Sequence, residues 1–191
     1  MTWWRQKERL FPDGKDKYKV LIVTYTDTHR GPMVREIFNK KMTDSMKKLV
    51  EFQSAGIYAD NGDNIAMDAY KALRKFGVRL SPYEHESNTL TKSLLDEPDC
   101  FLTMDIYGYD SLKNEMGKEE RLVRLTDYST DAEVKESKNV QSPRDNYCLD
   151  YNKLLDIFDD CTDNYLKYLA EKFNCENYYI KIKKPEHWWE V

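Results

Sequence analysis

Four short, largely apolar runs alternate along the chain with segments in which apolar residues recur every three or four positions. Runs rich in Val, Ile, Leu and Phe are typical of strands that are buried on both faces of a parallel sheet. The runs cover residues 18–25, 49–56, 99–105 and 121–128. We therefore predict four strands in this order.

The segments between the runs have the period of an amphipathic helix. One helix is expected to begin near Pro32, because proline fits the first helical turn. The clearest helical pattern covers residues 64–77 and ends at Gly77, a residue type that commonly follows a helix C-terminus. Further helices are predicted within 81–98, at 109–117 and at 151–173, with a polar loop at 129–147.

This alternation predicts an α/β fold, a three-layer sandwich in which helices cover both faces of a four-stranded parallel sheet. Right-handed crossovers between parallel strands place the helices in this way. A length of 191 residues favours one domain. We assign this domain to residues 18–173, with an N-terminal extension at 1–17 and a C-terminal tail at 174–191.

Charge and composition narrow the classes of partner. The net charge is −4 and the basic residues form no block, so nucleic acid is not an expected partner. There is no run of about 18 apolar residues and no signal-peptide pattern, so we expect no membrane and a cytoplasmic location. The cysteines lack metal-ligand spacing, so neither a metal nor a cofactor is expected; they are Cys100, Cys148, Cys161 and Cys175.

Each end of the chain carries a Trp-Trp pair, Trp3–Trp4 and Trp188–Trp189. Exposed tryptophans often mark a docking surface. The pairs therefore indicate either a homodimer or partner-protein contact, or two ends that fold back on the domain.

The loop that follows the first predicted strand has the features of an anion site. It lies at the carboxyl end of a parallel strand, where open α/β sheets bind ligands. The helix N-terminus after it offers unpaired N–H groups and partial positive charge, and Arg30 adds a planar fork of donors. The candidate phosphate-binding residues are Tyr25, Thr26, Asp27, Thr28, His29, Arg30 and Gly31. The alternative is an internal pair of Arg30 with Asp27 or Asp105.

This stretch resembles the low-molecular-weight protein tyrosine phosphatase family, whose fold is shared by thioredoxin-coupled arsenate reductases. The family signature is an apolar strand followed by Cys-x5-Arg-Ser/Thr-Pro-Met and a helix. Here "VLIV" is followed by Thr24 and then by Arg30, Gly31, Pro32 and Met33. Further similar segments are SAG at 54–56, ALRKFGVRLS at 72–81, FLTMD at 101–105 and VQSPRDNY at 140–147. The resemblance covers about residues 18–172.

The resemblance also implies a thiolate nucleophile and an aspartic acid that protonates the leaving group, and this chain has neither at the matching positions. Thr24 stands at the nucleophile position and Ser142 at the acid position. A thiol has a pKa near 8.5 that the loop can lower, whereas an alcohol starts far higher. Serine cannot act as a general acid near neutral pH. We therefore expect no catalytic residues here.

Three further loop positions depart from the family pattern. Thr26 and Asp27 replace its glycine and asparagine, and Gly31 replaces a hydroxyl residue that helps to stabilise the thiolate. Aspartate tolerates left-handed backbone angles, so Asp27 can still brace the loop. Its carboxylate would weaken anion binding unless it points away.

The resulting hypothesis is a pseudophosphatase, an inactive relative that binds phosphate, a phosphorylated small molecule or a phosphorylated protein at loop 24–31. One alternative is a residual or altered phosphatase with Thr24 or His29 as phosphoryl acceptor and Asp145 as acid. Another is a protein-interaction module with a vestigial loop. The predicted pocket rim consists of Asp105, Asp145 and Tyr147, with Tyr107, Tyr109 and Tyr128 nearby.

Overall fold

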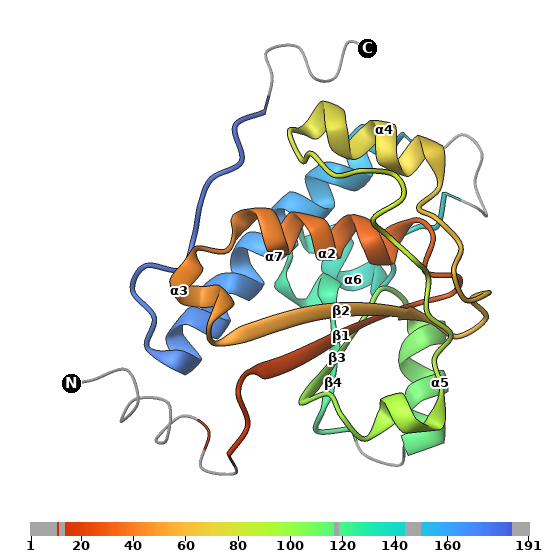
Figure 1. The fold of residues 1–191 in the computed structure, drawn as a ribbon, viewed down its shortest axis with the longest axis horizontal. Coiled ribbons are helices and arrows are strands. Elements are labelled where there is room, and N and C mark those ends of the chain that lie inside the picture. The colour runs from red at the N-terminus through yellow and green to blue at the C-terminus, as the bar shows by residue number, and fades with distance from the viewer. Residues whose placement is uncertain (1–10, 12–13, 117–118, 144–149, 185–191) are drawn as a thin grey trace.

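The computed structural model describes residues 11, 14–116, 119–143 and 150–184. Four strands form one sheet in the spatial order β2-β1-β3-β4, and every neighbouring pair is parallel (Figure 1). The strands are β1 (Tyr18–Thr24), β2 (Val50–Gly56), β3 (Cys100–Thr103) and β4 (Leu122–Arg124). The predicted α/β fold with a parallel four-stranded sheet is confirmed.

Alternate residues of the strands face two separate hydrophobic clusters. Val20 and Ile22 of β1 belong to the larger cluster, and Leu21 and Val23 belong to the smaller one. This division follows from the two-residue period of a strand. It explains why β1 is apolar at consecutive positions.

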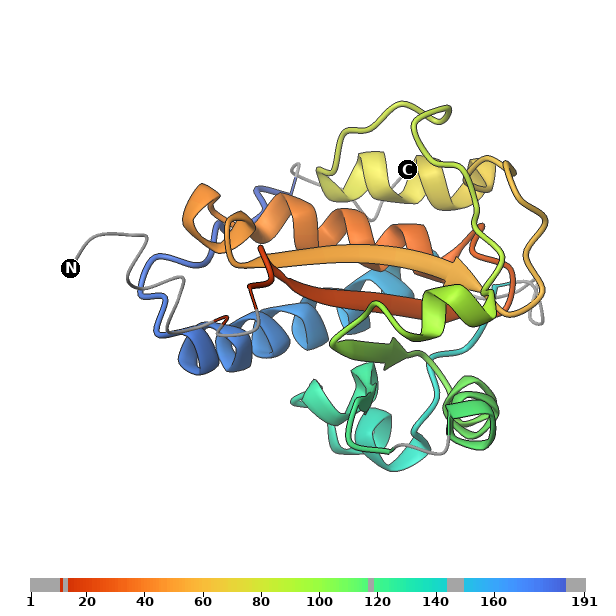
Figure 2. The ribbon, with the colours of Figure 1, turned by 60° about the horizontal axis from the view of Figure 1, so that its bottom comes forward.

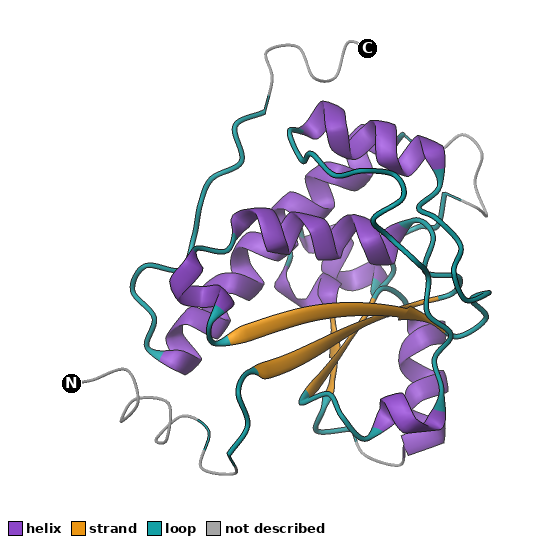
Figure 3. Cartoon of the chain, in the orientation of Figure 1, coloured by secondary structure: helices purple, strands orange, loops and turns teal. Residues whose placement is uncertain are grey.

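Helices cover both faces of the sheet (Figures 1 and 2). The larger cluster is completed by α2 (Arg30–Lys41), α4 (Met67–Phe76) and α7 (Tyr151–Phe173). The smaller one is completed by α5 (Ile106–Met116) and the 3-10 helix η1 (Lys92–Leu95). Figure 3 shows the sheet enclosed between these helices. The remaining short helices are α3 (Asp44–Lys47), η2 (Leu125–Tyr128) and α6 (Ala132–Ser137).

Two element predictions were wrong near the fourth strand. Residues 125–128 form η2 and not the second half of a strand. The predicted polar loop contains α6, which begins because the Asp131 carboxylate accepts hydrogen bonds from the Glu133 and Val134 N–H groups. The small helix α3 was also missed, and the Thr43 hydroxyl caps it in the same way.

Helix α2 is tied to α7 by a fully buried lysine. Lys41 Nζ lies 2.7 Å from Asp159 Oδ1 and donates a 2.9 Å hydrogen bond to Thr162 Oγ1, and it also pairs with Asp163. This network holds the two helices that cover the larger cluster. No helix in the described part of the chain is long and apolar enough to cross a membrane.

Candidate functional site

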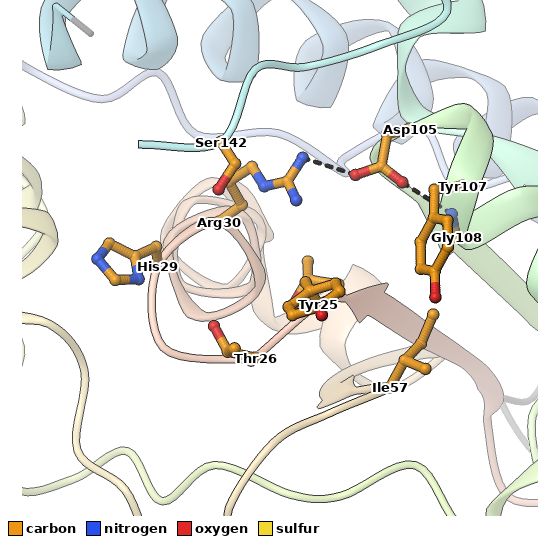
Figure 4. Close-up of a pocket in the computed structure, with 10 residues that line it drawn as sticks. Tyr25, Thr26, His29, Arg30, Ile57, Asp105, Tyr107, Gly108 and Ser142 are labelled. Atoms are coloured by element: carbon orange, nitrogen blue, oxygen red, sulfur yellow. Dashed lines mark hydrogen bonds and ion pairs between the residues drawn. The ribbon is translucent and has the colours of Figure 1, made fainter. Parts of the chain in front are cut away.

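A pocket of about 450 Å³ opens at the carboxyl end of the sheet (Figure 4). The segment that joins β1 to α2 forms one wall, and residues that follow β2, β3 and α6 form the others. The loop contributes Thr24, Tyr25, Thr26, His29 and Arg30. The other walls contain Ile57, Asp105, Tyr107, Gly108 and Ser142.

Arg30 is the first residue of α2 and is 5% exposed. Its Nη1 lies 2.9 Å from Asp105 Oδ2 and donates a 2.6 Å hydrogen bond to the Val140 carbonyl. Figure 4 shows the guanidinium turned toward Asp105 across the pocket. The internal pairing with Asp105 that the sequence left open is therefore present. Both contacts use Nη1, and anion binding through the rest of the guanidinium stays a prediction.

Thr24 ends β1 and places its hydroxyl on the pocket wall. The side chain is 5% exposed, and its Oγ1 accepts a 3.2 Å hydrogen bond from the Asp27 N–H. The backbone of Thr24 is held by the residue that follows β2, because the Ile57 N–H donates to the Thr24 carbonyl at 2.9 Å. The hydroxyl thus stands at a rigid position at the start of the loop.

Asp27 has a left-handed backbone, with φ at 53°, and its side chain is 1% exposed. The side chain does not line the pocket. Its Oδ2 accepts a 3.2 Å hydrogen bond from the Asn88 N–H, while Oδ1 forms no hydrogen bond with the described residues. Burial raises the pKa of this carboxyl to about 6, although Ser54, the Asn88 N–H and Arg35 act in the opposite direction.

A buried histidine holds the same loop from the other side. His85 is fully buried, and its Nε2 lies 2.6 Å from the Asp27 carbonyl. A donor at Nε2 leaves Nδ1 as an acceptor, and Nδ1 has no partner within the described residues. Burial lowers the pKa of His85, which favours this neutral form. The sequence analysis did not assign His85 to the site, since nothing local links residues 27 and 85.

Gly31 adjoins both Thr24 and Asp27. A Cβ added to Gly31 would lie 2.5 Å from Asp27 Oδ1 and 3.1 Å from Thr24 Oγ1. The carboxyl of Asp27 therefore occupies the space that a side chain at position 31 would need. The side chain of Asp27 therefore fits only because residue 31 is a glycine.

His29 precedes α2 and does not cap it with its side chain. Its Nδ1 lies 3.0 Å from Thr28 Oγ1, which in turn lies 3.0 Å from Thr26 Oγ1. The ring lines the pocket on the side away from Tyr107 (Figure 4). The bond to Thr28 ties the ring to the loop.

Three exposed tyrosines form a cluster at the pocket, and one of them, Tyr58, was missed from the sequence. The rings of Tyr25 and Tyr58 lie 4.8 Å apart, and those of Tyr25 and Tyr107 lie 6.1 Å apart. The hydroxyls of Tyr58 and Tyr107 are 3.0 Å apart. Each ring comes from a different segment, so only the tertiary structure brings them together.

Two other tyrosines predicted near the pocket lie elsewhere. Tyr109 packs under the Arg124 guanidinium, 4.6 Å from it, and belongs to the smaller hydrophobic cluster. Tyr128 packs against the ring of Tyr165 in the larger one, at 4.7 Å. Asp145 and Tyr147, predicted for the rim, lie outside the described residues.

Comparison with known proteins agrees with this architecture. The family model for low molecular weight phosphotyrosine protein phosphatases matches residues 19–175. The chain belongs to this family. A comparison with curated proteins finds no match.

Solved structures of other proteins show the same fold. The YwlE arginine phosphatase from Geobacillus stearothermophilus is 22% identical, with a TM-score of 0.62 over 83% of this chain and 94% of that one. YfkJ from Bacillus subtilis is 21% identical, with a TM-score of 0.70 over 83% and 98%. A YwlE mutant with a phosphorylated active-site serine is 20% identical, with a TM-score of 0.62 over 83% and 97%.

The structure brings to one place the positions at which the sequence analysis expects departures from the family pattern. Thr24 and Ser142 both line the pocket, and Ser142 lies beside Arg30 in Figure 4. Gly31 and Asp27 adjoin Thr24 from behind the pocket wall. The departures read from the sequence are thus concentrated around a single hydroxyl.

Proposed function

We propose that this chain is a catalytically inactive member of the phosphatase family that binds phosphate or a phosphorylated ligand at loop 24–31. The observation that carries the proposal is the Thr24 hydroxyl, which stands on the wall of the pocket that contains Arg30. The environment of a loop and helix N-terminus can ionise a thiol, but it leaves an alcohol neutral near pH 7. The proposal thus keeps the anion-binding role of the loop and assigns it no nucleophile.

Two described groups of the pocket wall, Ser142 and Asp105, are poorly suited to replace the missing acid. Ser142 occupies the pocket wall, and a serine hydroxyl does not protonate a leaving group near neutral pH. The Asp105 carboxylate accepts hydrogen bonds from Arg30 Nη1 at 2.9 Å and from the Gly108 N–H at 2.8 Å. Asp105 therefore holds the arginine and the start of α5.

The features that favour anion binding are the N-terminus of α2 and the buried guanidinium. Helix α2 has no acidic residue in its first turn, so its partial positive charge is not neutralised there. The Asp27 carboxylate, the one negative group within the loop, is turned away from the pocket. This orientation supports the proposal, because a carboxylate that pointed into the pocket would weaken anion binding.

Thermal stabilisation by phosphate tests the binding half of the proposal. Phosphate should raise the melting temperature of the wild type. At a phosphate concentration one hundred times Kd, the free energy of unfolding should increase by about 3 kcal/mol. Arg30→Met keeps an unbranched side chain but removes the guanidinium, and it should abolish the shift. Gln53→Met, at an exposed position outside the pocket lining, is the matched control and should keep it. A shift of equal size in Arg30→Met would contradict phosphate binding at this loop.

Hydrolysis of an aryl phosphate tests the catalytic half. The wild type should show no turnover above the buffer rate. Thr24→Cys combined with Ser142→Asp should restore turnover if the pocket retains the geometry of the active family. Turnover by the wild type that Thr24→Val abolishes would contradict inactivity and support the altered phosphatase.

A second candidate function is phosphoryl acceptance by Thr24 without release. It is favoured by the family member whose active-site serine is phosphorylated, which shows a hydroxyl carrying phosphate in this fold. In this reaction the Thr24 oxygen would form a bond to phosphorus while the bond from phosphorus to the aryl oxygen breaks, and the leaving aryl oxide would take the Thr24 proton and depart as the phenol. Mass spectrometry after incubation with an aryl phosphate should then find one phosphoryl group, absent in Thr24→Val.

The docking of a second copy or a partner through the Trp-bearing ends stays a prediction. All four tryptophans lie outside the described residues.

A further inference from the structure

The carboxyl of Asp27 lies behind the pocket wall, where the Ser54 hydroxyl lowers its pKa and the Thr24 hydroxyl lies on the other side of Gly31. The side chain is 1% exposed, and Oδ1 accepts no hydrogen bond from the described residues. A buried acceptor without a donor is costly, so a donor that comes within reach will be captured. The Asp27 backbone is fixed, since its carbonyl is bonded to His85 Nε2 at 2.6 Å and its Oδ2 to the Asn88 N–H.

The Thr24 hydroxyl borders the same small space. Asp27 Oδ1 and Thr24 Oγ1 would lie 2.5 Å and 3.1 Å from a single Cβ built on Gly31. The two oxygens therefore border one methyl-sized space beside Gly31, and rotation of either side chain would turn the hydroxyl toward Oδ1. Thr24 Oγ1 already accepts the Asp27 N–H, which leaves it one proton to donate and one lone pair. Because Thr24 also lines the pocket, its proton can go to Asp27 or to a ligand, but not to both.

We propose that Asp27, acting through Thr24, makes the loop select oxyanions that carry a proton, such as hydrogen phosphate, over oxyanions that carry none, such as sulfate. The inference rests on the proposed binding of phosphate at this loop. It assigns to Asp27 the role of a positioning residue that sets which end of the Thr24 hydroxyl faces the ligand. Because Gly31 has no side chain, the space between the Asp27 carboxyl and the Thr24 hydroxyl stays open.

The selection follows from counting donors. When Asp27 is ionised, the Thr24 O–H donates to Oδ1 and the remaining lone pair faces the pocket. A lone pair repels a bare oxyanion oxygen and accepts a hydrogen bond from a P–O–H group. When Asp27 is protonated, it donates to Thr24, and the Thr24 O–H turns into the pocket, where it suits any oxyanion. In both cases one proton accompanies the bound anion. It is carried either by the anion itself or by Asp27.

The charged groups around Asp27 allow this switch to be driven by pH. Burial raises the pKa of Asp27 to about 6, so the carboxyl is ionised at pH 8 and mostly protonated at pH 5. Arg35 of α2 favours the ionised form. His85 Nε2 lies 3.9 Å from Asp27 Oδ2, but burial lowers the pKa of His85, and Glu36 and Glu86 only partly oppose this. Asp27 is therefore the group that changes charge between these two pH values.

Titration calorimetry with phosphate and with sulfate tests the proposal on the full chain. At pH 8 the two probes are dianions of similar size, and only phosphate carries a proton. We expect the wild type to bind phosphate at least about tenfold more tightly than sulfate at pH 8, the effect of one hydrogen bond. Sulfate binding should strengthen about tenfold between pH 8 and pH 5. Equal affinities at pH 8 would overturn the selection while leaving the proposed phosphate binding intact.

Two variants separate this role from a merely structural one. Asp27→Asn places an amide donor beside Thr24 at every pH, so sulfate should bind about tenfold more tightly than to the wild type at pH 8 and lose its pH dependence. Thr24→Val removes the relay, so the preference for phosphate should disappear. Asp110→Asn, at an exposed position of α5 outside the pocket lining, is the matched control and should behave as the wild type.

The outcomes also separate the two proposals. A phosphate preference that survives in Asp27→Asn would overturn the role of Asp27, whatever the variant's stability. Absence of binding by either anion to every protein tested would overturn both this inference and the proposed function. Circular dichroism of each variant confirms that it is folded before its titration is interpreted.

Discussion

Replacing Asp27 by Asn should stabilise the folded protein above pH 7, against the usual effect of substitution at a buried site. The variant keeps the shape of the side chain, and its amide oxygen can still accept the Asn88 N–H bond seen at 3.2 Å. It removes a charge that is 1% exposed and that is bonded through only one of its two oxygens among the described residues. The expected gain is therefore the cost of ionising the carboxyl in the folded state.

The size of this gain follows from the pKa of Asp27, which burial raises from 3.8 to about 6. One pKa unit corresponds to about 1.4 kcal/mol, so ionisation costs about 3 kcal/mol when complete. The folded state holds the proton more tightly than the unfolded chain, so the wild type is not penalised below pH 3.8. It loses stability as the pH rises from 3.8 to about 6 and no more above that. The difference between variant and wild type should rise over the same range.

Urea denaturation from pH 4 to pH 8 measures this difference directly. We expect Asp27→Asn to be more stable by about 2–3 kcal/mol at pH 8 and nearly equal to the wild type at pH 4. The control Asp110→Asn, at an exposed position, should stay within about 0.5 kcal/mol at every pH. A variant that is destabilised by the same amount across the range would refute the reasoning, because the carboxylate would then be a favourable contact.

Two further substitutions test the packing that supports the site. Lys41→Met should destabilise the protein by about 1–3 kcal/mol in urea, because it removes the buried ammonium bonded to Thr162 and Asp159, while Lys184 still pairs with Asp159; a loss below about 0.5 kcal/mol would contradict a tight network. Gly77→Ala should lower the melting temperature more than Gly14→Ala does, although both glycines have positive φ. The reason is that a Cβ at Gly77 would lie 2.8 Å from the Lys183 carbonyl, whereas one at Gly14 meets nothing within 4 Å; equal losses would show that backbone conformation alone matters.

The order and type of the main elements could be predicted because the spacing of apolar residues along each segment indicates a strand or a helix. The apolar run of β1 packs against two hydrophobic clusters, as consecutive buried positions require. The helical period of residues 151–173 matches α7. Helix α6 was missed because its signal is the cap at Asp131, which is weaker than an apolar repeat. The early end of β4 was missed because the strand stops where its pairing with β3 stops, and the apolar composition of the run does not show that point.

The sequence by itself determined which groups the loop offers to a ligand. Hydroxyls at Thr24 and Ser142 follow from residue type alone, and so does the prediction that the pocket lacks a thiolate nucleophile and a carboxylic acid at these positions. Only the tertiary structure decided how the remaining groups are used. Arg30 pairs with Asp105, and the Asp27 carboxyl fills the space beside Gly31. These contacts depend on how strands and loops distant along the chain are placed, and on burial, which sets the charge of Asp27 and which no local pattern reveals.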